Sequence, residues 1–104
     1  MYIKAIISAN SKQEANRISD KLTQKKLVAG TLITKGDSRY HWKGDVVEKE
    51  YFNISCYTID SKKERIIENV EDIHSDDVPI IEFTEIDGNQ DFLDWIEGNI
   101  ADQG

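Results

Sequence analysis

The sequence is poor in the residues that cross-link a chain or anchor it in a membrane. Its 104 residues include a single cysteine, Cys56, and a single proline. One cysteine excludes an intrachain disulfide and a thiolate-rich metal site built within one chain. Residues 1–9 lack the long apolar core of a signal peptide, and no run of about eighteen apolar residues occurs elsewhere. We therefore expect a cytoplasmic setting and no membrane partner.

Positive charge is also scarce, with 13 lysines and arginines against 20 aspartates and glutamates and a net charge of -7. A negative surface repels phosphate backbones, which argues against a nucleic-acid partner. The sequence also has no nucleophile elbow, no phosphate-binding loop and no histidine placed to activate Cys56. We therefore predict that the protein is not an enzyme.

The apolar pattern predicts one domain over residues 1–104, in which 101–104 form a frayed tail. Alternating apolar residues predict four strands, over Tyr2–Ala9, Val28–Trp42, Val46–Ile59 and Ile80–Ile86. Two helices are predicted where a Ser-x-x-Glu capping box occurs, at residues 11–14 and 61–64, and a short third helix follows Asn89. A tight turn is expected at residues 43–45 because Gly44 can adopt positive φ, and a bulge at residues 36–37.

This order predicts an α+β fold of the ferredoxin-like βαββαβ type. Right-handed crossovers place the two helices on one face of an antiparallel sheet, and a short C-terminal helix follows. By strand alternation the opposite face carries Ile6, Tyr51 and Tyr57, which is more apolar than a solvated face should be. Burial against another copy of the chain is the simplest way to cover it.

Three motifs resemble segments of the CutA divalent-ion tolerance family. Residues 38–44 read Ser-x-Tyr-x-Trp-x-Gly, as in that family, and residues 74 and 79 match the ends of its His-Pro-Tyr-x-x-Pro loop. Residues 88–95 read Gly-x-x-x-Phe-Leu-x-Trp, similar to the family's closing Gly-x-x-x-Tyr-Leu-x-Trp. The resemblance runs from about Ser8 to Ile96. It implies a homotrimer, in which long hairpins and sheet edges join across subunits, and an association with divalent metals, copper above all.

The chain departs from the family pattern where ligands would be bound. The cysteine expected near the start of the second strand is absent from residues 27–30. The family's lysine is replaced by Tyr57 and its glutamate by Ile80, the two positions that the resemblance assigns to a ligand cleft. The Pro-Tyr of the loop is replaced by Ser-Asp at residues 75–76. The matches to the family thus lie mainly at positions that maintain the fold.

The candidate metal ligands are His74, Asp76 and Asp77, a mixed nitrogen and oxygen set for Cu(II) or another divalent cation. The alternative for His74, which the sequence favours, is a solvated helix end, where the helix dipole stabilises an imidazolium. Cys56 could be a soft copper ligand. Its strand phase instead favours a buried thiol that behaves as a small hydrophobic side chain.

Large aromatic residues at a hairpin tip need a partner surface. Tyr40 and Trp42 could each bury on the order of 150–250 Å². Together with Tyr51 and Tyr57 they are the predicted trimer interface, and a ligand-stacking platform is the alternative. The leading functional hypothesis is a CutA-like homotrimer that acts in divalent metal tolerance and binds a metal ion or small ligand at subunit clefts. The alternatives are a small-ligand sensor of the nitrogen-regulatory PII type and a purely structural trimer.

Overall fold

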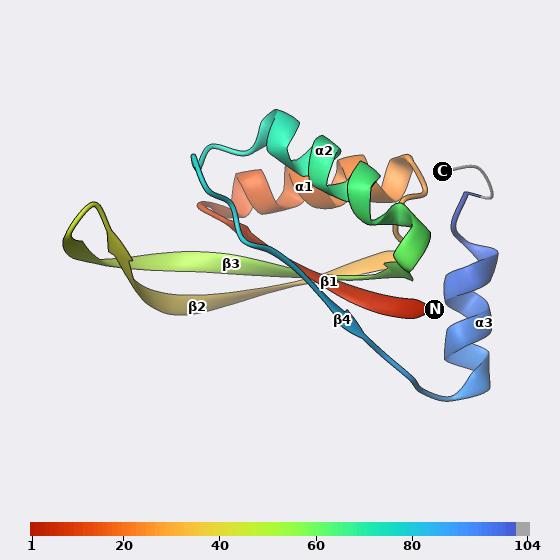
Figure 1. Cartoon of the computed structure of the whole chain (residues 1–104). Helices are drawn as coiled ribbons and strands as arrows, with labels where there is room; N and C mark the ends of the chain where they lie inside the picture. The colour runs from red at the N-terminus through yellow and green to blue at the C-terminus, as the bar shows by residue number, and fades with distance from the viewer. Residues whose placement is uncertain (102–104) are drawn as a thin grey trace.

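A four-stranded antiparallel sheet organises the chain (Figure 1). The computed structural model describes residues 1–101, and its strands lie in the order β2-β3-β1-β4. Along the chain the elements are β1 (Tyr2–Ala9), α1 (Lys12–Gln24), β2 (Gly30–Trp42), β3 (Asp45–Ile59), the 3-10 helix η1 (Asp60–Lys62), α2 (Lys63–Ile73), β4 (Ile81–Glu85) and α3 (Gln90–Gly98). The predicted βαββαβ order with a further C-terminal helix is confirmed.

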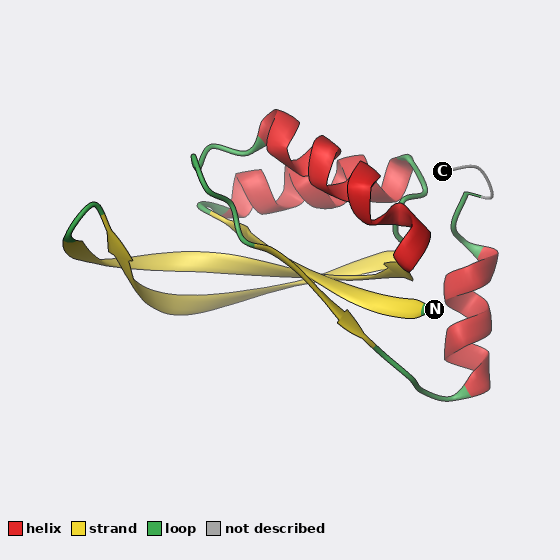
Figure 2. Ribbon diagram, viewed as in Figure 1, coloured by secondary structure: helices red, strands yellow, loops and turns green. Residues whose placement is uncertain are grey.

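Helices α1 and α2 cover one face of the sheet (Figure 2). Alternation along β1 buries Ile3, Ala5 and Ile7, and alternation along β3 buries Ile54 and Cys56 on the same side. The helices contribute apolar stripes at helical spacing, namely Ala15, Ile18 and Leu22 from α1 and Ile66 and Val70 from α2. None of the helices within residues 1–101 is long and apolar enough to cross a membrane.

The two predicted capping boxes behave differently. At the start of α1 the Ser11 hydroxyl accepts a hydrogen bond of 3.1 Å from the Glu14 amide, as predicted. The second box is wrong, because residues 60–62 form a 3-10 turn and α2 begins without a side-chain cap. The chain leaves β3 in an extended conformation at Ile59 and tightens at once into this turn, so the turn's own backbone bonds start the helix.

The β2–β3 hairpin is long and regular. Its register runs without interruption from the pair Gly30 and Tyr57 to the pair Trp42 and Asp45. The bulge predicted at residues 36–37 is therefore wrong, since strand twist bends the hairpin without an extra residue. The predicted turn is confirmed as a two-residue loop, in which Lys43 and Gly44 have φ of 50° and 86°. The hairpin extends well beyond the helices (Figure 1).

Helix α3 closes the end of the sheet near the N-terminus of β1. The Phe92 ring meets Tyr57 edge to face, with centroids 5.4 Å apart. Gly30 lets Trp95 approach the backbone, since a β-carbon there would lie 2.8 Å from the indole ring. Part of the face expected to be uncovered is thus covered by the chain itself. Ala101 donates its amide to the Lys26 carbonyl at 3.0 Å, while the rest of the predicted tail, residues 102–104, lies outside the described residues.

The hairpin turn yields a stability prediction. Gly44→Ala should lower the free energy of unfolding by about 1–2 kcal/mol, because an L-residue at φ of 86° is strained. Gly36→Ala is the matched control: it lies in the same hairpin with open space around it and should change stability by less than about 0.5 kcal/mol. Urea unfolding followed by circular dichroism measures both. Equal effects would contradict the assignment of strain to the turn.

Candidate functional site

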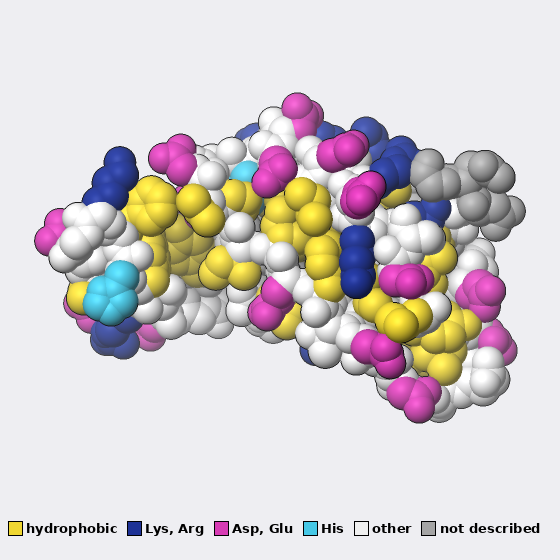
Figure 3. Space-filling model, viewed as in Figure 1, with side chains coloured by type: hydrophobic (Ala, Val, Ile, Leu, Met, Phe, Trp, Pro, Cys, Tyr) yellow, Lys and Arg dark blue, Asp and Glu magenta, His cyan; other side chains and the backbone are white. Residues whose placement is uncertain are grey.

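A groove of about 780 Å³ lies between the distal half of the hairpin and the segment that links α2 to β4. We call it the hairpin groove. Its volume falls within the range of small-molecule pockets. Hydrophobic side chains gather at this end of the molecule (Figure 3). The lining includes the aromatic residues Tyr40, Trp42 and Tyr51 of the hairpin, and Asp76, Asp77 and Val78 of the linking segment.

Tyr51 connects the hairpin to the other wall of the groove. Its hydroxyl donates to Asp76 Oδ2 at 3.0 Å and lies 3.3 Å from the Tyr40 hydroxyl. The two tyrosine rings meet edge to face, with centroids 5.8 Å apart. Burial, together with the hydrogen bonds to Tyr40 and Asp76, raises the pKa of Tyr51 above its ordinary value. The phenol therefore stays protonated and keeps donating.

Asn10 follows the last residue of β1 and joins this strand to the α2–β4 segment, which forms one wall of the groove. Its Nδ2 donates to Ser75 Oγ at 3.1 Å and to the Asp76 carboxylate. Its Oδ1 accepts from the Lys49 ammonium group, which also lies 5.4 Å from the centroid of the Tyr51 ring. A single side-chain amide thus links β1, β3 and the α2–β4 segment.

Glu14 supports this network from α1. One carboxylate oxygen accepts a hydrogen bond of 2.8 Å from the backbone amide of Asn10. The other accepts a hydrogen bond of 2.8 Å from the backbone amide of Ser75. Burial alone would raise the pKa of Glu14, but the hydrogen bonds from Asn10 and Ser75 outweigh it, so this pKa lies below its ordinary value of 4.5. The reciprocal bond of the capping box is therefore made to residue 10 instead of Ser11, and it also reaches a segment far along the chain.

His74 is buried beneath the groove wall, with its side chain only 1% exposed. Its Nε2 lies 2.6 Å from the Ser8 carbonyl oxygen, and its Nδ1 accepts the Asp76 amide at 3.0 Å. A carbonyl can only accept, so Nε2 carries the proton in this arrangement. Both ring nitrogens are thus engaged with the backbone, and the alternative of a solvated helix end is wrong.

The remaining predicted residues are dispersed. Tyr57 packs on Phe92 of its own α3, and by register it lies beside Lys4. Ile80 lies beside Ser8 at the other end of β1, where its amide donates to Ser8 Oγ at 3.1 Å. The predicted cleft pair is therefore not brought together, and only Ile80 lines the hairpin groove.

The fold is that of a small α+β domain with a groove at its hairpin, and comparison with known proteins identifies its family. The family model described as CutA1 divalent ion tolerance protein matches residues 3–99. The chain therefore belongs to the CutA1 family, as its motifs indicated.

Individual relatives agree with this assignment. The divalent-cation tolerance protein CutA of Thermus thermophilus is 30% identical over 96 residues, which cover 90% of this chain and 93% of that protein. The CutA of Archaeoglobus fulgidus is 33% identical over 95 residues, with 90% and 93% covered. A solved structure of the Archaeoglobus fulgidus protein matches 97% of this chain and 100% of its own, with a TM-score of 0.94 and 31% identity.

The predicted cytoplasmic location is wrong. The Archaeoglobus fulgidus structure is described as that of a periplasmic protein. The prediction rested on a single cysteine and on the lack of a long apolar run. A chain with one cysteine forms no intrachain disulfide in an oxidising or a reducing compartment, so the cysteine count does not distinguish the two locations.

The residues of one chain do not fit a resident divalent metal. Within residues 1–101, no three histidine, cysteine, aspartate or glutamate side chains are grouped to hold an ion. Both nitrogens of His74 are already engaged with the backbone. Cys56 is fully buried in the core, out of reach of an ion at the groove, and burial raises the pKa of its thiol to about 12, which disfavours the thiolate.

Residues of the network that sequence analysis missed are Asn10, Ser75 and Lys49. Each is a common surface residue, and no short-range pattern marks it. Glu14 was recognised only as part of a capping box. It lies in the first turn of α1, soon after the end of β1, and this position was the one signal that it could reach a neighbouring segment. The pairing of α1 with a segment about sixty residues away is a tertiary property, which no local pattern reports.

Glu14 yields a prediction for stability and its pH dependence. Glu14→Gln should lower the free energy of unfolding by about 1–3 kcal/mol at about pH 7, because one of the two amides loses its acceptor. Because folding lowers the pKa of Glu14, the ionised carboxylate stabilises the folded protein above pH 4.5. This stabilisation is lost as the pH falls through the pKa that Glu14 has in the folded state.

The difference in the free energy of unfolding between the parent and Glu14→Gln should therefore shrink as the pH falls below 4.5. Urea unfolding across this pH range measures it. The control is Glu64→Gln, an exposed residue in the first turn of α2, which should change stability by less than about 0.5 kcal/mol. A difference that grows on acidification would refute the role given to Glu14.

Cys56 yields a prediction for copper. Cys56→Ala should bind Cu(II) with an affinity within about twofold of the parent, because a thiol with a pKa of about 12 in the core offers no thiolate. Copper titration by calorimetry measures the affinity, and circular dichroism confirms that the variant is folded. A tenfold loss in a folded variant would show that Cys56 is a ligand after all.

Proposed function

We propose that this member of the CutA1 family serves divalent-cation tolerance as a homotrimer and catalyses no reaction. The observation that carries the proposal is the hairpin, which extends beyond the helices and bears Trp42 with 38% of its surface exposed (Figure 1). An isolated hairpin is marginally stable in water, and large aromatic residues favour burial. Neighbouring copies of the chain supply the missing cover.

Other exposed apolar residues support the same arrangement. Leu32 on β2 is 57% exposed, and Val78 and Ile80 beside β4 are 68% and 59% exposed. Strands β2 and β4 are the two outer strands of the sheet, so each has one edge that the described residues do not pair. Such edges can add strands from another chain. Apolar patches next to open sheet edges are typical of protein interfaces.

The proposed interface differs in part from the one predicted from sequence. Tyr40 and Trp42 remain candidates, and Tyr51 contributes through its contact with Tyr40. Tyr57 would contribute less, since it packs on Phe92. The link to divalent cations rests on family membership. For Cu(II) or another divalent cation, Asp76 and Asp77 offer oxygen atoms at the groove, and a second copy would have to complete the ligand set.

The trimer can be tested by light scattering coupled to size exclusion. We expect a mass of about three times the 11.9 kDa of one chain at micromolar concentration. Trp42→Ala should lower the melting temperature and make it depend more strongly on protein concentration, because interface anchors commonly contribute about 2 kcal/mol or more each.

The matched control is Phe92→Ala, which removes an aromatic ring from α3. That ring is partly buried and packs on Tyr57 of its own chain, so its loss should lower stability without increasing the concentration dependence. A parent protein that is monomeric, or a Trp42→Ala variant that keeps its mass and its melting temperature, would overturn the proposal.

A further inference from the structure

We propose that Asp87 is a site of spontaneous covalent modification, at which the side chain closes on the next backbone nitrogen and reopens to an isoaspartyl linkage that loosens α3. This inference goes beyond the proposed function and does not require the trimer, because the proposed interface contains no residue of the loop 86–89. It rests on the residue that follows Asp87, on the contact between the two reacting groups and on the packing of the loop.

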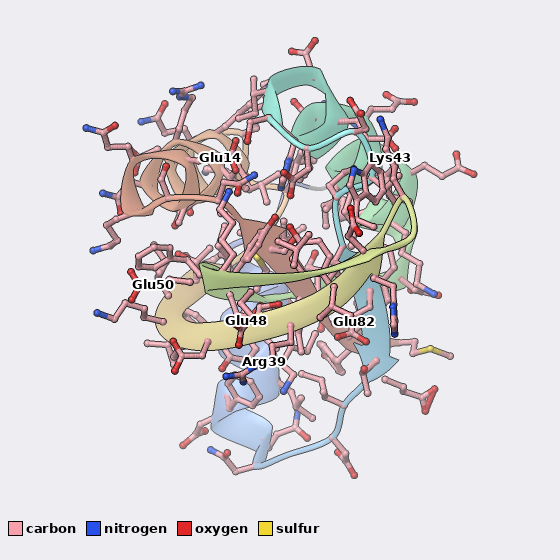
Figure 4. The ribbon with its side chains drawn as sticks, turned by 90° about the vertical axis from the view of Figure 1, so that its left-hand side faces the viewer. Glu14, Arg39, Lys43, Glu48, Glu50 and Glu82 are labelled. Carbon is pink, nitrogen blue, oxygen red and sulfur yellow. The ribbon has the colours of Figure 1, made fainter. Side chains whose placement is uncertain are left out.

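The loop of residues 86–89 joins β4 to α3 and contains the only Asp-Gly pair of the chain. A glycine after an aspartate leaves the backbone nitrogen unshielded, since glycine has no β-carbon, and it lets the backbone adopt the conformation that ring closure needs. Asp87 and Gly88 are both exposed, so water can reach the ring and open it. The loop lies at the lower edge of the molecule in Figure 4, below the labelled hairpin residues Arg39 and Glu48.

The two reacting groups already lie in contact. The Gly88 amide donates a hydrogen bond of 2.8 Å to Asp87 Oδ1, so the backbone nitrogen faces the side-chain carboxyl group. Within residues 1–101 this carboxyl group forms no ion pair that would hold it away from the nitrogen. The folded loop therefore keeps the nucleophile and the carbon that it attacks side by side.

The reaction is a dehydration followed by a hydration. The Gly88 nitrogen forms a bond to Cγ of Asp87, and the hydrogen of that nitrogen leaves as water together with the hydroxyl of the protonated carboxyl group. The product is a five-membered succinimide ring. Water then adds to one ring carbonyl and breaks its bond to nitrogen. Opening at Cγ restores aspartate, whereas opening at the backbone carbonyl leaves the chain running through Cγ as isoaspartate. No atom is gained or lost overall, and no oxidant or reductant is needed.

The modification lengthens a loop that is fixed at both ends. At its start, Ile86 donates its amide to the Tyr2 carbonyl at 3.0 Å. At its end, the Phe92 ring of α3 lies so close to Gly88 that a β-carbon there would be 3.0 Å from the ring. An isoaspartyl linkage adds one carbon to the backbone between these two contacts. The Phe92 ring then cannot keep its contacts with both Gly88 and Tyr57, so α3 packs less tightly on the sheet.

The test is prolonged incubation of the full chain in mildly acidic buffer, followed by digestion and mass spectrometry with electron-transfer fragmentation, which distinguishes isoaspartate from aspartate. A glutamate-specific protease releases residues 86–97, a peptide that also contains Asp91 and Asp94 as internal controls. Both controls lie in α3 and precede a bulky aromatic residue. Isoaspartate at residue 87 should therefore exceed that at either control about tenfold.

Two variants of Asp87 test the chemistry. Asp87→Glu keeps the negative charge but could close only a less favourable six-membered ring, so it should form no isomer at this position. Asp87→Asn is the positive control, because it loses ammonia in place of water. It should form isoaspartate about tenfold faster than the parent, which corresponds to a barrier lower by about 1.4 kcal/mol. At full conversion the melting temperature of the parent should fall by about 4 °C, while that of Asp87→Glu incubated in parallel should not change.

Two results would overturn the inference. The first is isoaspartate at residue 87 no more abundant than at Asp91 and Asp94, which removes the site. The second is isoaspartate at residue 87 without a fall in melting temperature relative to Asp87→Glu, which removes the effect on α3. Light scattering before incubation keeps this inference separate from the proposed function, since the mass tests the trimer and the isomer content tests the site.

Discussion

The buried carboxylate of Glu14 is the interaction on which the shape of the site depends. A buried carboxylate is tolerated only when both its oxygens find donors, and here the donors are backbone amides at the start of α1 and in the α2–β4 segment. Satisfying one charge therefore fixes the relative position of two segments about sixty residues apart. The wall of the hairpin groove follows from this, because Asp76 comes next after Ser75 and meets Tyr51.

Further hydrogen bonds connect the α2–β4 segment to β1 and to the hairpin. His74 ties the same segment to the end of β1 through the Ser8 carbonyl, and Asn10 ties it to Lys49 of β3. Each of these hydrogen bonds fixes the alignment of two elements, which non-directional apolar packing does not set by itself. The core sets which faces pack together, whereas the polar network sets where the groove opens.

Local pattern was enough for the strands, the first cap and the hairpin turn. Period-two alternation placed Ile54 and Cys56 in the core, and Gly44 marked the turn. It failed at Ser61, where a capping motif occurs but the backbone turns before the hydroxyl can act. It also failed for His74, because the imidazole is buried against the end of β1, where Nε2 meets the Ser8 carbonyl, and no local pattern reports a contact between residues so far apart in the chain. The groove could not be predicted, since it depends on the twist of a hairpin against a distant segment.

The uninterrupted register of the hairpin limits how the chain can vary over evolution. With every residue of β2 paired in sequence to β3, inserting or deleting one residue in a strand would exchange the two faces beyond that point. Trp42 would then turn from the groove side to the opposite side. Viable length changes are accordingly those that add or remove residues two at a time in both strands. Among related chains, hairpin length should change in such paired steps, and the aromatic positions should keep their parity relative to the turn.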